Sequence, residues 1–224
     1  ERFFSASQKL KGKKALVTAG PTHEAIDPVR FIGNNSSGKM GYAIAEELAS
    51  QGAEVNLVSG PTNLTMTNPR VKLSKVTSAE EMYKACLAIF PSIDIAVLSA
   101  AVADFKPVNR ADQKIKKTEA GLMVELTKTA DIAAELGKMK KANQFTVGFA
   151  LETENETANA EKKIVSKNFD LIVLNSLNDN GAGFSHDTNK ITLINRNKEA
   201  KKFSLKSKKE VARDIVNAVI ENYA

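Results

Sequence analysis

The chain has 224 residues, with 32 basic and 26 acidic side chains, a formal net charge of +6, three tyrosines and no tryptophan. Because the lysines are scattered and few aromatic rings are available to stack on bases, the composition disfavours a nucleic-acid-binding module. No apolar run reaches the roughly twenty residues that span a bilayer. The only cysteine, Cys86, excludes an intrachain disulfide and a thiolate metal cluster, which favours a reducing, cytoplasmic location.

We expect one folded unit at 13–224, preceded by a polar tail or linker at 1–12. An apolar, β-branched run at 14–18 predicts a strand, and apolar residues at helical spacing predict a helix at 42–50. The segment between them, GPTHEAIDPVRFIGNNSSGKMG at 20–41, stands where a nucleotide-binding fold has a short glycine turn. Loops of this length inside a domain are usually functional, so we expect it to hold substrate chemistry.

Three kinds of polar group lie in this loop. Ser36, Ser37 and Gly38 supply hydroxyls and a flexible backbone at a helix N-terminus, which suits an anion; a serine-capped helix that packs closely on the strand is the alternative. Arg30 carries a planar fork suited to a carboxylate or phosphate, and the amide of Asn34 can bind a carbonyl or acyl phosphate. Alternatively, both side chains only stabilise the loop through hydrogen bonds to its backbone.

The next strands are predicted at 54–59, 71–76 and 94–99, with a helix at 79–90. The first turn lacks G-x-G-x-x-G, and the strand at 54–59 ends in Ser59 and Gly60 without an acid for ribose hydroxyls, so a standard nicotinamide site is disfavoured. Asp104 follows the buried strand at 94–99. A carboxylate there can hold a divalent cation that bridges nucleotide phosphates, or it can simply cap a turn.

Two strand-like runs at 114–117 and 122–127 predict a lysine-rich hairpin or flap, whose Lys114, Lys116 and Lys117 either form a solvated face or partly face a cleft. Lys163 and Lys167 lie four apart on a predicted helix; a bound polyphosphate would relieve their repulsion, and the alternative is two surface lysines. The remaining predicted elements are a helix at 131–140, strands at 145–150 and 171–174, a hairpin that pairs 190–195 with 200–205, and a final helix at 208–222.

Alternating strands and helices predict an α/β fold with a doubly wound, mainly parallel, Rossmann-like sheet and inserted β-hairpins. Ligands bind such sheets at the carboxyl ends of the strands, so the polar residues described above should converge on one crevice. The two histidines lack metal-ligand spacing, and the sequence offers no serine or cysteine triad. The chemistry is therefore expected to rest on positioning and electrostatics, as in nucleotidyl transfer.

With these residues in view, the chain resembles the phosphopantothenate:cysteine ligase family, the phosphopantothenoylcysteine synthetases of coenzyme A synthesis. In bacteria such a synthetase is usually the C-terminal half of a bifunctional chain whose other half is a flavin-dependent decarboxylase. The resemblance rests on TAGPTHEAIDPVRFIGNNSSGKMG, SAAVADF, KIKK, GFALET and KNFDLI, in this order.

The resemblance implies a reaction in which the carboxylate of 4'-phosphopantothenate attacks CTP to give an acyl-cytidylate and pyrophosphate, and L-cysteine then displaces CMP. It also implies Mg2+ and a homodimer. By position, Asn34 would handle the acyl-cytidylate, Arg30 would order the loop or substrate, and Lys114 would bind nucleotide phosphate and assist turnover. The implied CTP site consists of Leu98, Ser99, Ala100, Ala101, Asp104 (also the candidate Mg2+ ligand), Ala130, Asp131, Ile132, Ala133, Phe149, Lys163 and Lys167.

Two positions depart from the family pattern. Gly33 replaces a frequent serine and could loosen the loop around Asn34, and Thr129-Ala130 replaces a frequent Asn-Pro before Asp131. Two other functions stay open on the sheet pattern and the charge: an NADP-dependent Rossmann-type reductase, and a noncatalytic basic module that binds RNA.

Overall fold

The computed structural model describes residues 8–117, 121–152, 154–176 and 187–223. Residues 1–7 of the predicted tail and 118–120 of the predicted hairpin turn therefore lie outside the described residues. The helices are α1 (Lys39–Ser50), α2 (Ala79–Ile89), α3 (Ile132–Met139), α4 (Glu156–Ser166) and α5 (Lys208–Asn222), with a short 3-10 helix at Phe90–Ser92.

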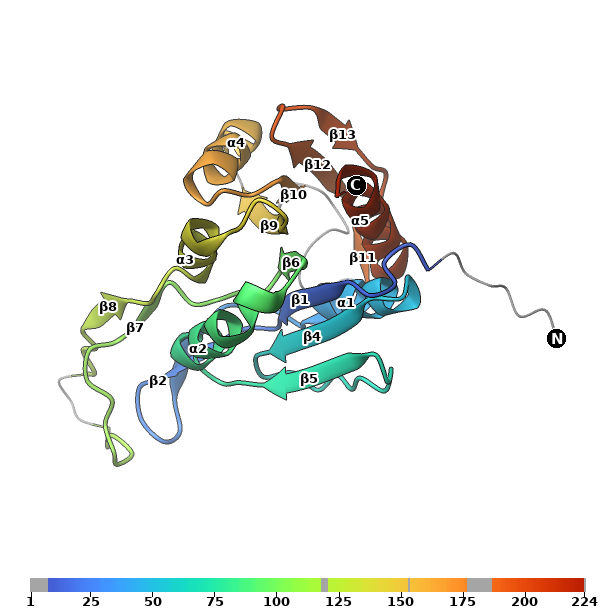
Figure 1. The fold of residues 1–224 in the computed structure, drawn as a ribbon. Coiled ribbons are helices and arrows are strands. Elements are labelled where there is room, and N and C mark those ends of the chain that lie inside the picture. Colours follow the sequence, from blue (N-terminus) through green and yellow to red (C-terminus); the bar gives the residue numbers. More distant parts are fainter. Residues whose placement is uncertain (1–7, 118–120, 153, 177–186, 224) are drawn as a thin grey trace.

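The strands form one large sheet and three small ribbons (Figure 1). The eight-stranded sheet has the order β13 (Ala200–Lys202), β12 (Ile191–Asn195), β10 (Leu171–Ser176), β9 (Phe145–Glu152), β6 (Ile95–Leu98), β1 (Lys14–Ala19), β4 (Glu54–Ser59) and β5 (Val71–Lys75). The ribbons pair β2 (His23–Ala25) with β3 (Phe31–Gly33), β7 (Phe105–Pro107) with β8 (Leu126–Lys128), and β11 (Thr188–Asn189) with β14 (Lys206–Ser207).

Six neighbouring strands of the sheet, from β5 to β10, run parallel, and β12 joins β10 antiparallel. The predicted α/β fold with a doubly wound, mainly parallel sheet is confirmed. The chain first builds outward from β1 through β4 to β5 and then crosses to β6 on the other side of β1. The strand order reverses between β1 and β6, which is where an open α/β sheet forms its ligand crevice.

Helices cover both faces of the sheet because successive strand residues point to opposite sides. In β1, Ala15 and Val17 pack in one core with residues of α1 and α5, whereas Leu16 packs in a second core with residues of α2 and α3. A third core joins α4 to β9 and β10.

Cys86 lies fully buried in the second core, where loss of solvation raises the pKa of its thiol to about 12. It therefore packs as a small apolar side chain and is not a nucleophile.

The final helix shows how local sequence sets an element. Ser207 caps α5 by accepting a hydrogen bond from the Glu210 N–H, and the Glu210 carboxylate accepts one from the Ser207 N–H in return. Val211, Ile215 and Val219 follow at helical spacing and are fully buried against the sheet and α1. Each such side chain stabilises the fold by about 1.5–3 kcal/mol on burial.

The predicted lysine-rich hairpin, which pairs 114–117 with 122–127, is wrong. The paired strands are β7 and β8, whereas Lys114–Lys117 form no strand. The physical reason is that the backbone of Ile115 is already committed: its N–H donates to the buried carboxylate of Asp27 at 3.2 Å, and its C=O accepts from the Arg30 guanidinium at 3.2 Å. The predicted pairing of 190–195 with 200–205 is confirmed as β12–β13, which extends the main sheet.

None of the helices among the described residues is long and apolar enough to cross a membrane.

Candidate functional site

A cavity of about 420 Å³ opens at the carboxyl ends of β1, β6 and β9, bounded by the N-terminus of α3 and one face of α4; we call it the α3–α4 cavity. Ten of the residues expected at a nucleotide site line it: Leu98, Ala100, Asp104, Ala130, Asp131, Ile132, Ala133, Phe149, Lys163 and Lys167. Segments that lie far apart in the sequence therefore meet there, as the sheet topology requires. Residues that the sequence-based site did not include also line it: Thr18, Val102, Phe105, Lys128, Thr129 and Phe169.

The charged wall of the α3–α4 cavity is held in place by an ion pair. Asp131 caps α3 by accepting a hydrogen bond from the Ala134 N–H at 3.0 Å, and its other carboxylate oxygen lies 3.0 Å from the ammonium of Lys167. Partial burial opposes the charge on Asp131, but these two contacts outweigh it and hold the pKa of the carboxyl below its ordinary value. Asp131 is thus an anion that orients Lys167, rather than a proton donor.

A second, smaller cavity of about 170 Å³ adjoins the first, and Ala100 and Phe149 line both. It lies at the N-terminus of α1, and we call it the α1 cavity. Its walls comprise the predicted anion loop with the start of α1, the end of β6 and the carboxyl ends of β9 and β10, together with side chains from the C-terminal part of the chain. The lining residues are Ser36, Ser37, Gly38, Lys39, Met40, Gly41, Ser99, Ala100, Ala101, Phe149, Ala150, Leu151, Asn175, Asn189 and Lys208.

Gly38 sets the entry to α1. Its φ of 75° lies in the left-handed region, and a Cβ added there would approach the Thr62 Cγ2 to 2.8 Å. Its N–H donates to the Ser36 hydroxyl at 3.3 Å. The segment 36–38 therefore presents a turned backbone and the positive end of a helix to the cavity, as expected for an anion loop.

Lys208 is the most unusual group of the α1 cavity. It begins α5 and is only 8% exposed. Loss of solvation and the charge of Lys39 lower the pKa of its ammonium, while Asp187 opposes that shift. Lys39 is itself ion-paired with Asp187, an exposed carboxylate that is not among the lining residues, so the described residues of the cavity wall include two lysines and no acidic side chain. An anionic ligand group would stabilise this arrangement.

Asn34 and Arg30 lie outside both linings. The Asn34 amide donates to the Val102 carbonyl at 2.9 Å, which ties the loop to a residue of the α3–α4 cavity wall. Arg30 pairs with the buried Asp27 at 2.7 Å and donates to the Ile115 carbonyl, so it orders the loop and the segment around Ile115. Of the two roles expected for Arg30, this geometry favours ordering of the loop over a direct substrate contact.

Lys114 does not line either cavity. Its side chain is exposed in the segment that precedes Ile115. Lys116 and Lys117 line a separate hollow of about 190 Å³ together with Arg30 and Leu122. The expectation that Lys114 contacts nucleotide phosphate within one subunit therefore finds no support in the lining of the α3–α4 cavity.

Asp104 is an exposed carboxylate in the wall of the α3–α4 cavity, and its C=O accepts the Thr129 N–H. Within the described ranges, no cluster of three or more histidine, cysteine, aspartate or glutamate side chains could hold a metal ion. Asp131, the other carboxylate of the cavity lining, is paired with Lys167, so Asp104 is the carboxylate left to meet a cation. One such carboxylate fits a magnesium ion that arrives with nucleotide phosphates, because Mg2+ takes few protein ligands and keeps waters or phosphate oxygens.

Most residues expected at the nucleotide site line the α3–α4 cavity, whereas Ser99 and Ala101 line the α1 cavity instead. The motif at 99–105 contains Val102 and Phe105, which lie within two positions of Asp104 and could have been included. In contrast, no local pattern places Asn175, Asn189 and Lys208 beside the loop at 36–38. Asn175 belongs to β10 and Asn189 to β11, and Lys208 comes there through the packing of α5 against α1.

Comparisons with known proteins agree with this geometry. A family model described as "DNA/pantothenate metabolism flavoprotein C-terminal domain" matches residues 10–223. The chain is 51% identical over 222 residues, 97% of its length, to a "Cysteine/Cysteine sulfinic acid decarboxylase" from an unknown prokaryotic organism. It is 47% identical over 221 residues, 99% of its length, to the "Coenzyme A biosynthesis bifunctional protein CoaBC" of Haemophilus influenzae.

The chain spans 62% and 54% of the lengths of these two relatives. Among solved structures, the crystal structure of the C-terminal domain of Coenzyme A biosynthesis bifunctional protein CoaBC superposes with a TM-score of 0.80 at 41% sequence identity, covering 96% of this chain and 97% of that one. The sheet, the position of the cavities and the family match lead to one assignment: the chain belongs to the DNA/pantothenate metabolism flavoprotein C-terminal domain family.

Proposed function

We propose that this chain is a CTP-dependent ligase that joins 4'-phosphopantothenate to L-cysteine through an acyl-cytidylate, releasing pyrophosphate and CMP. One observation carries the proposal: two cavities suited to anions adjoin at Ala100 and Phe149, at the carboxyl ends of the central strands. Two substrates placed in them would meet at the shared wall. Holding reactants in contact supplies much of the rate enhancement when a protein offers no covalent catalyst.

CTP fits the α3–α4 cavity, whose volume of about 420 Å³ lies within the range of ligand pockets. The triphosphate would lie against Lys163 and Lys167 and near the N-terminus of α3, where positive charge and the helix dipole favour it. Phe149 would pack beside the cytosine. Mg2+, if held by Asp104 and the phosphates, would neutralise charge on the triphosphate.

The phosphate of 4'-phosphopantothenate fits the α1 cavity. The first turn of α1 would supply backbone N–H groups, and Lys39 together with the buried Lys208 would supply charge. The extended body of the substrate would then direct its carboxylate toward the wall shared at Ala100 and Phe149.

With both substrates bound, the protein would promote the reaction by holding the reacting groups next to each other. The carboxylate oxygen would attack the α-phosphorus of CTP, and the bond to the departing pyrophosphate would break. Next, the cysteine amine would attack the acyl carbon, CMP would leave with its phosphate oxygen, and the amine would lose a proton. Asn34, tied to Val102 at the cavity wall, would direct its amide oxygen or nitrogen at the acyl-cytidylate without reacting itself.

A homodimer is part of this proposal. Large apolar side chains are exposed on the β2–β3 and β7–β8 ribbons and the segment between β7 and β8, which a partner subunit would cover: Val29, Phe31, Phe105, Val108, Leu122, Met123 and Leu126. Lys114 lies in the same region, so contact with the nucleotide of a partner subunit is consistent with its place outside the cavity lining. We also propose a cytoplasmic location, where CTP is available, and fusion to a flavin-dependent decarboxylase in the full chain.

The direct test is to incubate the protein with CTP, Mg2+, 4'-phosphopantothenate and cysteine and to measure CMP and pyrophosphate. Pyrophosphate release with a trapped acyl-cytidylate is expected when cysteine is withheld. Asn34→Asp should lose amide formation, because a carboxylate would repel the anionic intermediate and could not donate to the Val102 carbonyl. Asn35→Asp, at the exposed neighbouring position, is the matched control and should stay active.

Three results would replace this proposal. Tight NADP binding without CTP binding would favour a reductase. Carbon dioxide release from cysteine or cysteine sulfinic acid, the activity in the name of the first relative, would favour a decarboxylase. Salt-dependent RNA binding unaffected by CTP would favour a noncatalytic module.

A further inference from the structure

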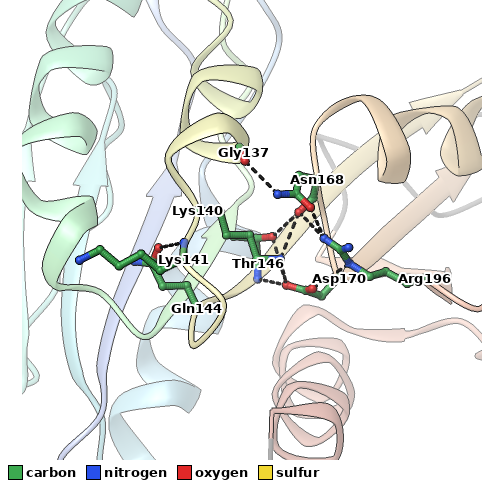
Figure 2. Close-up of polar contacts among 8 residues, drawn as sticks. All are labelled: Gly137, Lys140, Lys141, Gln144, Thr146, Asn168, Asp170 and Arg196. Carbon is green, nitrogen blue, oxygen red and sulfur yellow. Dashed lines mark hydrogen bonds and ion pairs between the residues drawn. The ribbon is translucent and has the colours of Figure 1, made fainter.

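The wall of the α3–α4 cavity includes part of the turn that follows α4. Lys167 and Phe169 of this turn line the cavity. Asn168 and Asp170, between and after them, make polar contacts with α3 and β9 (Figure 2). Because the four residues are consecutive in one tight turn, contacts that fix the backbone at Asn168 and Asp170 also restrict the backbone of Lys167 and Phe169. The contacts of Asn168 and Asp170 therefore bear on the position of the Lys167 ammonium.

Asn168 is a hub. Its φ of 53° lies in the left-handed region, which asparagine tolerates better than most residues. Its side-chain amide donates to the Gly137 carbonyl of α3 at 2.9 Å, and its own C=O accepts from Lys140 and Thr146 at 3.1 Å and from Arg196 at 2.9 Å.

Asp170 contacts three of the same residues through its carboxylate. Its carboxylate accepts from the Thr146 N–H at 2.7 Å, lies 2.9 Å from the Arg196 Nε and is ion-paired with Lys140. Arg196 thus forks between Asn168 and Asp170, a geometry that lysine cannot reproduce. The Lys140 side chain is only 6% exposed, so water cannot easily replace the partners of its ammonium.

The contacts of Asn168 and Asp170 connect four parts of the fold: α3 and the residue after it, the start of β9, the turn between α4 and β10, and the turn after β12 (Figure 2). A direct backbone contact reinforces them. A Cβ added at Gly137 would lie 2.3 Å from the Lys167 carbonyl oxygen, so α3 and the end of α4 are already at closest approach. The position of Lys167 is therefore set both by the contacts of Asn168 and Asp170, which fix its backbone, and by the ion pair of its side chain with Asp131.

We infer that Asn168, Asp170, Lys140, Thr146 and Arg196 form a positioning cluster that holds Lys167 in place to bind nucleotide phosphate. The inference rests on the proposed function, in which Lys167 meets the triphosphate. These residues do not touch the nucleotide; they act through Lys167. Arg196 is the best point of intervention because its side chain is half exposed and its removal leaves Asp170 paired with Lys140.

The experiment compares Arg196→Met with Lys198→Met. Lys198 lies in the same turn as Arg196 and pairs with Glu161 of α4 at 3.0 Å, so the control breaks an ion pair from that turn without touching 167–170. Arg196→Met should raise the KM for CTP roughly tenfold, the effect of losing one charge-assisted contact, with kcat and the KM for cysteine unchanged. Lys198→Met should leave all three at the unaltered values, and Arg196→Lys should recover part of the CTP affinity.

A double-mutant cycle tests whether Arg196 acts through Lys167. In a Lys167→Ala background, adding Arg196→Met should raise the KM for CTP less than about twofold. Effects that multiply in full would overturn the inference. So would an Arg196→Met protein that is less stable to heat but has an unchanged KM for CTP.

A measurement without ligand separates this inference from the proposed function. Amide hydrogen exchange at 163–171 should be faster in Arg196→Met than in Lys198→Met if the cluster holds this segment. Equal exchange in the two variants would refute the positioning role even in an active ligase. Faster exchange in a protein that does not bind CTP would instead refute the proposed function while leaving the cluster as the element that holds the segment.

Discussion

The α3–α4 cavity and the α1 cavity share two wall residues but are built in different ways. The first presents charged side chains that are already paired and oriented, above all Lys167 with Asp131. The second relies on the turned backbone at Gly38 and on Lys208, which is buried beside Lys39. A preorganised ion pair costs little to rearrange on binding, whereas a buried lysine near another lysine gains most when an anion arrives.

This difference matches the two proposed ligands. A triphosphate spreads several charges along an extended group and needs several fixed contacts. A single terminal phosphate needs one compact site. The comparison predicts that substitutions in one cavity will change the affinity of one substrate and leave the other substrate unchanged, even though the cavities adjoin.

The largest effect is expected from removing Lys163 of α4 and Lys167 at its C-cap, the two lysines proposed to meet the triphosphate. Lys163→Ala with Lys167→Ala should weaken CTP binding by roughly one hundredfold or more, since each charged contact to phosphate contributes about 1.5–3 kcal/mol. Binding of 4'-phosphopantothenate should be unchanged. Titration calorimetry with each ligand measures both, and Lys162→Ala, on the exposed side of the same helix, is the control. Equal losses for both ligands would mean that the two cavities act as one site.

Lys208→Met is the counterpart in the α1 cavity. It should weaken 4'-phosphopantothenate binding about tenfold and leave CTP binding intact, because it removes one charge from the proposed phosphate site. Thermal stability at neutral pH should not fall, since a buried lysine with a lowered pKa gives way to an apolar side chain of similar length. Lys209→Met is the exposed neighbouring control. Unchanged binding of 4'-phosphopantothenate would remove Lys208 from the phosphate site.

Gly137→Ala tests the packing beneath the α3–α4 cavity alone. In an open helix position alanine stabilises relative to glycine by about 0.5–1 kcal/mol. Here the added methyl meets the Lys167 carbonyl, so we expect destabilisation of about 1–3 kcal/mol in urea unfolding, with several-fold weaker CTP binding. Lys138→Ala, at the exposed neighbouring position of α3, should show neither effect. A stabilised Gly137→Ala protein would show that α3 and α4 can separate freely.

The smallest effect concerns the loop at 20–41, whose end lines the α1 cavity and whose Asn34 is hydrogen-bonded to Val102 in the wall of the α3–α4 cavity. Burial opposes ionisation of Asp27, but hydrogen bonds from the N–H groups of Val29, Arg30 and Ile115, and the charge of Arg30, hold the pKa of its carboxyl below the ordinary value. Its contribution to stability is therefore present above about pH 4 and is lost as the pH falls through the lower pKa of the folded state.

Melting temperatures measured from pH 7 downward check this sign. Asp27→Asn should melt a few degrees below the unaltered protein at neutral pH, and the difference should shrink in acid. A difference that stays constant down to pH 2 would contradict the assignment. Glu47→Gln, a carboxylate on α1 away from the loop, should show no such trend.

Much of the fold was predictable because its elements carry local signals. The final helix was expected at 208–222 and is observed at Lys208–Asn222, where a capping box and apolar spacing agree. The strand expected at 54–59 is β4. The hairpin at 114–127 was not predictable, because the backbone of Ile115 bonds to Asp27 and Arg30, residues more than eighty positions away.

The candidate site divides along the same line. By itself the sequence determined the periodic strands and helices and the doubly wound sheet, whose topology brings Leu98, Ala100 and Phe149 to the α3–α4 cavity. The wall residues from α3 and α4 were expected from the resemblance to the family. Only the tertiary structure decided that Lys208 joins the loop at 36–38, that Lys114 lies away from both cavities, and that Asn168 and Asp170 hold the segment behind Lys167. Periodicity records whether a side chain meets core or water, but not which distant segment it meets.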